Sequence, residues 1–189
     1  MHRELIIYIN NHSSTPLNDG DIKLIKTAFI PKKIRKKQFL LVEGDTCHHL
    51  SFIVKGSMRQ FSVDNKGTEH VVRLFIENWL VADRESFSKN TPSPYFIETL
   101  EETQLLMLNK SDFEKLIQVP AVAETSRAMD EAHAFAFQKR NLDLISLTVM
   151  ERYDQFVEAY PEFIQRFPQH LIASYLGVTK ETLSRVRNS

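Results

Sequence analysis

The stretch that decides the fold reads QHLIASYLGVTKETLSRVR and covers residues 169–187. It has the features of two short helices that cross steeply around a tight turn. Ala173 is small enough to lie where two helix backbones approach, and Gly177 tolerates the positive φ that the turn requires. Thr179 is a good N-cap for the second helix. Together with the apolar spacing, these residues predict a helix-turn-helix over Gln169–Arg187.

The two faces of this motif differ in polarity. The residues expected to face inward are Ile172, Leu176, Val178, Leu183 and Val186. The opposite face is polar and suits the base edges and phosphates of double-stranded DNA. We expect Arg185 to bond guanine and Glu181 to accept a hydrogen bond from cytosine. Phosphate contacts are expected from Gln169, Thr179, Lys180 and Arg187, and Ser184 completes the face. The alternative is a pair of amphipathic helices that only pack in a bundle.

Upstream, residues 38–108 carry short apolar runs between turn signals, which is typical of a small β-barrel or jelly roll. The expected strands are Phe39–Val42, Leu50–Val54, Met58–Val63, His70–Phe75, Trp79–Ala82, Tyr95–Leu100 and Leu105–Leu108. Before them, residues 4–30 are predicted to be helical, with Asn10–Gly20 as a polar break.

After the strands, the periodicity becomes helical. Asn109 or Ser111 is expected to cap a short helix that ends at Ile117. Pro120 then opens a long helix to about Asp143, with Val122, Met129 and Ala136 seven residues apart. This spacing suits either a dimer seam or a helix that packs on its own domain.

The next helix is predicted from a capping box. Thr148 and Glu151 have the spacing of such a box, and the helix is expected to run through Ala159. Pro161 should end it, because proline cannot continue a helix from this position.

Composition excludes several function classes. Lys+Arg and Asp+Glu both total 24, so the net charge is zero, but the basic run Lys32–Lys37 is expected to form a solvated face. The single cysteine, Cys47, cannot form an intramolecular disulfide or a four-cysteine cluster and suits a reducing compartment. No apolar stretch reaches transmembrane length, so no membrane partner is expected and the cytoplasm is the predicted location.

No catalytic motif is evident, so we expect a protein that is not an enzyme and needs no cofactor. His48, His49 and His70 raise the alternative of a cupin-like metal site. Neighbouring strand residues point to opposite faces, however, and no glutamate completes a ligand set. We therefore predict surface histidines and no bound metal.

Four stretches of the chain resemble the Crp/Fnr family of bacterial transcription regulators. They are FLLVEGD at 39–45, HLSFIVKGSMR at 49–59, DNKGTE at 64–69 and VTKETLSR at 178–185. The resemblance implies a cyclic-nucleotide-binding-like β-roll, a long dimerisation helix and a winged-helix domain. It also implies a homodimer on a near-palindromic site, with recognition helices ~34 Å apart. A contact with RNA polymerase is left open.

Two departures from the family pattern limit what the resemblance implies. Asp83 lies near the position of the family's ribose-binding Glu, and Ser93 or its neighbours replace the Arg that holds the cyclic phosphate. A buried phosphate without a cation is costly, so we expect an effector other than cyclic AMP. The candidate effector pocket is Arg73, Trp79, Asp83 and Arg84. The chain ends at Ser189, directly after the second helix, so we expect the wing to be truncated.

These inferences combine into an α+β prediction with three parts. They are a β-roll sensor over residues 1–118, a dimerisation helix over 119–145 and a helix-turn-helix over 146–189. The predicted function is DNA-binding transcription regulation by a homodimer with an unknown small-molecule effector. The alternative is a small-molecule-binding module whose helical tail contacts proteins.

Overall fold

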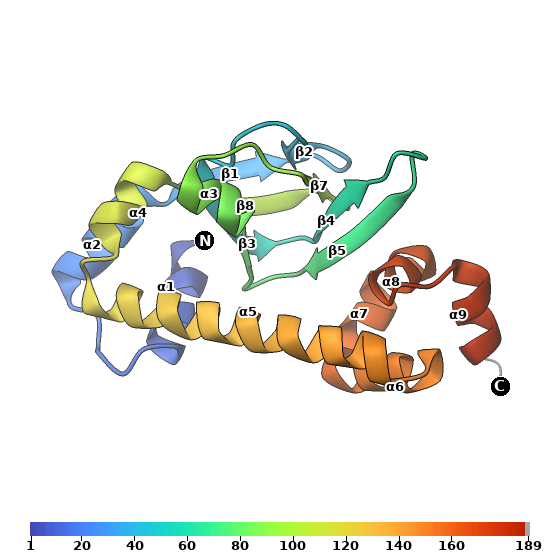
Figure 1. Cartoon of the computed structure of the whole chain (residues 1–189). Helices are drawn as coiled ribbons and strands as arrows, with labels where there is room; N and C mark the ends of the chain where they lie inside the picture. Colours follow the sequence, from blue (N-terminus) through green and yellow to red (C-terminus); the bar gives the residue numbers. More distant parts are fainter. Residues whose placement is uncertain (188–189) are drawn as a thin grey trace.

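The computed structural model of the chain describes residues 1–187 (Figure 1). It opens with two helices, α1 (His2–Asn11) and α2 (Asp19–Ala28), as the polar break predicted. The second begins with a capping box, in which the Asn18 side chain accepts from the backbone N–H of Asp21 and the Asp21 carboxylate accepts from that of Asn18. The predicted helix–break–helix arrangement is confirmed.

Two four-stranded antiparallel sheets follow within the described residues, in the orders β1-β8-β3-β6 and β2-β7-β4-β5. The strands are β1 (Ile30–Ile34), β2 (Phe39–Leu41), β3 (His49–Lys55), β4 (Met58–Val63), β5 (Glu69–Phe75), β6 (Leu80–Val81), β7 (Phe96–Thr99) and β8 (Thr103–Asn109). All seven predicted strands are present, with shifted ends, and the jelly-roll prediction is confirmed.

Two elements of the roll were not predicted. Strand β1 contains Pro31 and two lysines of the basic run, and it forms only because it pairs along the edge with β8. Exposed lysines on an edge strand discourage pairing with another chain. The short helix α3 (Arg84–Lys89) follows β6, and the Asp83 side chain caps it.

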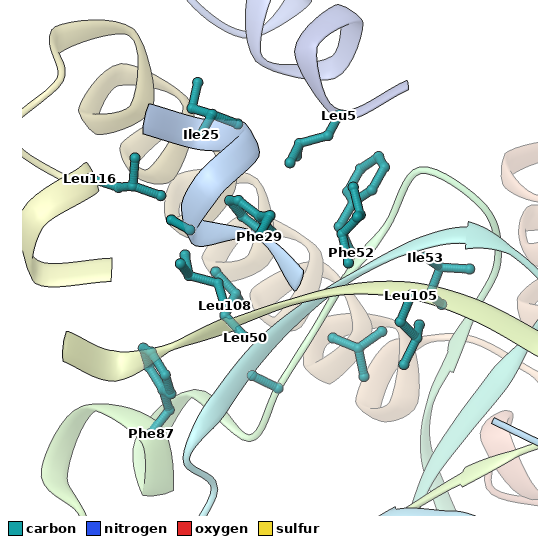
Figure 2. Packing of buried hydrophobic residues seen from close by; sticks show 14 of the residues in the cluster. Leu5, Ile25, Phe29, Leu50, Phe52, Ile53, Phe87, Leu105, Leu108 and Leu116 are labelled. Atoms are coloured by element: carbon teal, nitrogen blue, oxygen red, sulfur yellow. The ribbon is translucent and has the colours of Figure 1, made fainter. Parts of the chain in front are cut away.

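The core of the roll also holds the N-terminal helices in place. Figure 2 shows Leu5 and Phe29 beside Phe52 of β3, and Ile25 beside Leu116. Phe52 and Ile25 are fully buried, and Leu5 is 2% exposed. Burying one such side chain contributes about 1.5–3 kcal/mol.

Two helices lead away from the roll. Asn109 caps the short helix α4 (Lys110–Leu116), as one of the two alternatives predicted. The long helix α5 (Pro120–Ser146) then runs past the roll to the C-terminal helices (Figure 1). None of the helices within residues 1–187 has the length and apolarity needed to cross a membrane.

Two of the three heptad-spaced residues of α5 face their own chain, and the third, Ala136, is exposed. Val122 is buried in the core of the roll, and Met129 accepts a hydrogen bond from the hydroxyl of Tyr8 in α1. The heptad spacing suited either a dimer seam or packing of the helix on its own domain. Val122 and Met129 therefore follow the second alternative. The strongly exposed apolar residues of α5 are Phe135, Phe137, Leu142, Leu144 and Ile145.

The C-terminal region is helical to the last described residue. Thr148 and Glu151 form the predicted capping box of α6 (Val149–Ala159). Pro161 follows the end of α6, as expected, but it also opens the unpredicted helix α7 (Pro161–Arg166), where its missing N–H costs nothing. The last two helices of the described residues are α8 (Gln169–Tyr175) and α9 (Lys180–Arg187).

Candidate nucleic-acid interface and effector cavity

Helices α8 and α9 have the local geometry that their sequence predicts. Gly177 adopts φ +74°, and a Cβ there would meet only Leu144 at ordinary contact distance. The backbone conformation, rather than crowding, is therefore the reason for glycine. Ala173 is 1% exposed, and the Thr179 hydroxyl accepts from the backbone N–H of Thr182 at 3.2 Å.

The apolar side of the motif is buried and its polar side is accessible. Leu183 is fully buried, whereas Lys180, Glu181, Arg185 and Arg187 are exposed. Ser184 and Gln169 are half-buried, and Thr179 is exposed at the turn. The Arg187 guanidinium lies 5.9 Å from the ring centroid of Tyr153 in α6. The seven predicted contact residues thus lie on α9, its cap and the start of α8.

Helix α8 is docked against the β-roll, which sequence inspection did not predict. The backbone N–H of Val71 in β5 donates to the Ser174 hydroxyl at 2.9 Å, and that hydroxyl donates to the Glu69 carbonyl at 3.3 Å. In Figure 1, α8 lies next to β5 and α9 lies on the far side of α8. The docking therefore uses α8 and leaves α9 facing outward.

Two arginines reinforce this junction. Arg140 of α5 donates to the carbonyls of Val72 and Tyr175, both at 2.7 Å, and so ties β5 to the end of α8. Arg166 of α7 pairs with Glu77 at 2.8 Å and Glu101 at 2.7 Å, both in the roll. No short-range pattern flags either contact, because the partners are 35 to 89 residues apart.

The four predicted effector residues do not form one pocket. Arg73 and Trp79 line a cavity of about 360 Å³ bounded by β5, α5 and the C-terminal helices. Asp83 instead caps α3 with one carboxylate oxygen, and its other oxygen is buried without a hydrogen-bond partner among residues 1–187. Arg84 pairs with Asp130 of α5. The four residues predicted to form one effector pocket therefore belong to three separate features, which are a cavity, a helix cap and an ion pair.

A second cavity, of about 260 Å³, lies at the mouth of the roll between β2, the turn at 42–49 and Ala82. No lysine or arginine is among its described lining residues. Ser93, near the position where the family's phosphate-binding Arg is expected, is 2% exposed, and its hydroxyl bonds the backbone of Tyr95. The described lining of this cavity therefore provides no lysine or arginine to hold a phosphate.

The remaining candidate residues are dispersed. His48, His49 and His70 are exposed, and no cluster of three or more His, Cys, Asp or Glu residues suited to a metal occurs within residues 1–187. Cys47 is 6% exposed, and burial raises the pKa of its thiol, which favours the unreactive protonated form.

Comparison with known proteins agrees with this architecture. Residues 31–119 match the cyclic nucleotide-binding domain family. The catabolite activator protein of Thermus thermophilus is 23% identical with a TM-score of 0.58, and the match covers 91% of this chain and 83% of that one. FixK2 of Bradyrhizobium japonicum is 20% identical with a TM-score of 0.71, over 85% and 83% of the two chains.

A third similar structure is the c-di-GMP responsive global regulator CLP of Xanthomonas campestris. It is 15% identical with a TM-score of 0.65 over 90% of both chains. No curated protein sequence matches the chain significantly. Residues 31–119 therefore have the fold of a cyclic nucleotide-binding domain, and the chain shares the overall fold of these solved structures.

Proposed function

We propose that this chain is a DNA-binding transcription regulator of the Crp/Fnr type that acts as a homodimer. The observation that carries the proposal is the exposed polar side of α9, which lies on the far side of α8 from the β-roll. Lys180, Glu181 and Arg185 on this helix offer the donors and acceptor that major-groove recognition requires. The division into a sensor over 1–118, a helix over 119–145 and a DNA-binding part over 146–189 belongs to the same proposal.

The proposed dimer interface is the outer face of α5. Phe135 is 67% exposed, Leu142 is 61% exposed and Ile145 is 86% exposed. Phe135 and Leu142 are seven residues apart, and Ile145 follows three residues later, which is the spacing of a coiled-coil seam. This seam lies one residue earlier in the heptad than the positions of Met129 and Ala136. Pairing would remove these side chains from water and place two copies of α9 side by side for successive major grooves.

DNA binding is tested by selecting binding sites from random duplexes with the wild-type protein, followed by gel-shift titrations on the selected site. Arg185→Ala should weaken specific binding by about 10–100-fold and relax the base preference. Lys180→Ala should weaken binding to all sequences and reduce the salt slope by about one.

The matched control is Lys115→Ala, which removes an exposed charge of α4, at the opposite end of the molecule from α9 (Figure 1). It should bind as the wild type does. Wild-type affinity in both α9 variants would rule out this face as the DNA contact. Absence of any salt-dependent DNA affinity would favour the alternative of a small-molecule-binding module with a protein-interaction tail.

The dimer is tested by sedimentation of the double variant Phe135→Glu with Leu142→Glu. Two carboxylates in the seam should convert the dimer to monomers, because burying unpaired charges is costly. Phe137→Glu adds a carboxylate at an equally exposed residue of the same helix, about 200° around the helix from Phe135 and outside the heptad positions of the seam, and should leave the dimer intact. A dimer that persists in the double variant would contradict this interface.

A further inference from the structure

The cavity that contains Arg73 and Trp79 lies where four parts of the chain meet, one of which is the end of α1 with Tyr8 and His12. Arg73 comes from β5, Trp79 from the segment before β6, and His133 from α5. Tyr160, Phe163 and Tyr175 come from the C-terminal helices and the joint between α6 and α7. With a volume of about 360 Å³, the cavity falls in the size range of small-molecule sites. A molecule bound there would contact the β-roll, α5 and the C-terminal helices together.

Arg73 gives the cavity an uncompensated positive charge. Its guanidinium forms no hydrogen bond or ion pair within residues 1–187, and the guanidinium carbon lies 6.0 Å from the centroid of the Phe75 ring. Burial, together with Arg84 and Arg140, lowers the pKa of Arg73, but an arginine remains charged at neutral pH. No Asp or Glu is among the described residues that line the cavity. A partly buried guanidinium without an anion is costly, and a ligand carboxylate would relieve that cost.

His133 of α5 adds an unused polar atom to the lining of the same cavity. Its Nδ1 is buried without a hydrogen-bond partner in the described part of the chain. Burial and the charges of Arg73 and Arg84 lower the pKa of His133 to about 4, so the imidazole is neutral. A neutral imidazole can donate one hydrogen bond through Nδ1, which suits the second oxygen of a carboxylate held by Arg73.

The rest of the wall is largely aromatic. The Trp79 ring centroid lies 6.2 Å from that of Tyr160 and 5.7 Å from that of Phe163. Tyr160 and Phe163 stack on each other at 4.9 Å. Such ring edges and faces provide contacts for one further planar ring.

We propose that this cavity binds a small aromatic carboxylate, with the carboxylate on Arg73 and His133 and the ring against Trp79 and Tyr160. This inference rests on the proposed function, since it names the class of effector for the regulator. Because the ligand contacts β5 and the helices that carry α9, it would bind the docked arrangement better than an undocked one. It would thereby shift the population toward that arrangement.

Trp79 is the only tryptophan in the sequence, so its fluorescence reports directly on this cavity. The full chain, without DNA, is titrated with benzoate, phenylacetate and 3-phenylpropionate, which differ in the spacing between ring and carboxylate. Phenylacetamide serves as the neutral counterpart of phenylacetate. At least one acid should give a saturable change in Trp79 emission, and phenylacetate should bind at least about tenfold tighter than its amide, because only the anion pairs with Arg73.

The variant Arg73→Gln should lose about tenfold or more in affinity for the acid. Arg127→Gln, which removes an exposed guanidinium of α5 outside the cavity, should bind as the wild type does. The proposal is overturned if none of the three acids saturates the signal, if the amide binds as tightly as the acid, or if both variants lose equally. The comparison of acid with amide uses the wild-type chain and so does not depend on the folding of Arg73→Gln.

The two proposals fail separately. A chain that binds DNA but none of the acids keeps the regulator function and loses this effector class. A chain that binds an acid but no DNA keeps the cavity assignment and supports the small-molecule-binding alternative.

Discussion

The β-roll and the C-terminal helices are stabilised by different kinds of core. The roll closes on itself with a mostly aliphatic cluster, completed by α1, α2, α4 and the start of α5. The C-terminal core is rich in aromatic residues, and three of its buried members, Phe61, Val71 and Leu74, belong to β4 and β5. The helices that carry α9 therefore complete their core only when they dock on the roll. The orientation of α9 is in this way tied to the surface of the sensor.

Polar contacts across this junction also join the helices to the β-roll. Arg140 and Ser174 use backbone groups of β5 at its edge, where no further strand pairs within the described sheets. Arg166 reaches two carboxylates of the roll and is about a third exposed. An exposed ion pair of this kind contributes little, so the buried rings and Arg140 carry most of the docking.

The largest effect should come from truncating one core phenylalanine in each region. Phe52→Ala in the roll and Phe163→Ala in the C-terminal core should each cost about 3–5 kcal/mol. Because the C-terminal core needs β4 and β5, Phe52→Ala should weaken amide protection in both regions. Phe163→Ala should weaken it in α8 while sparing β3, as measured by hydrogen exchange. Equal loss of protection in β3 for both variants would contradict two separate cores.

A smaller effect is expected from Arg140→Gln, which removes a charged donor from two carbonyl oxygens. Docking of α8 on β5 should weaken by about 2–3 kcal/mol, because both carbonyls lose a charge-assisted hydrogen bond. The readout is amide exchange of Leu171–Leu176 relative to β3. Lys139→Gln removes the neighbouring charge, whose partners in the described part of the chain are Asp143 of α5 and Gln155 of α6, and should change this exchange by less than about 0.5 kcal/mol.

The smallest expected effect is the pH dependence of stability that comes from His133, which lies at the boundary between the two regions. Its pKa is about 4 in the folded chain against an ordinary value of 6.5, because of burial and then of Arg73 and Arg84, with Asp130 acting in the opposite direction. As the pH falls, His133 is protonated at a higher pH in the unfolded chain than in the folded chain. The contribution of neutral His133 to the free energy of unfolding is therefore present above pH 6.5 and is lost as the pH falls toward 4.

Urea unfolding at several pH values checks this contribution. His133→Gln should remove on the order of 1 kcal/mol of the acid-side loss, after allowance for solvent screening of a half-buried group. A constant difference between His133→Gln and wild type from pH 7 to pH 4.5 would show that His133 does not titrate in this way.

Much of the fold was predictable because its signals are local. Short apolar runs between turn signals located the seven strands, and the capping box of Thr148 and Glu151 located the start of α6. Gly177 and Thr179 specify their turn through φ and one hydrogen bond, and both behave as predicted. The elements that were missed have weak local signals: β1 depends on its partner β8, and α3 and α7 are only six residues long.

By itself, the sequence determined the β-roll, the long helix and the helix-turn-helix, together with the polar side of α9. These depend on side-chain periodicity and on caps and turns that act over a few residues. Only the tertiary structure decided that Val122 and Met129 face inward, that α8 docks on β5, and that Arg73 and His133 meet across one cavity. Residues this far apart in the chain are brought together by packing, which no local pattern encodes.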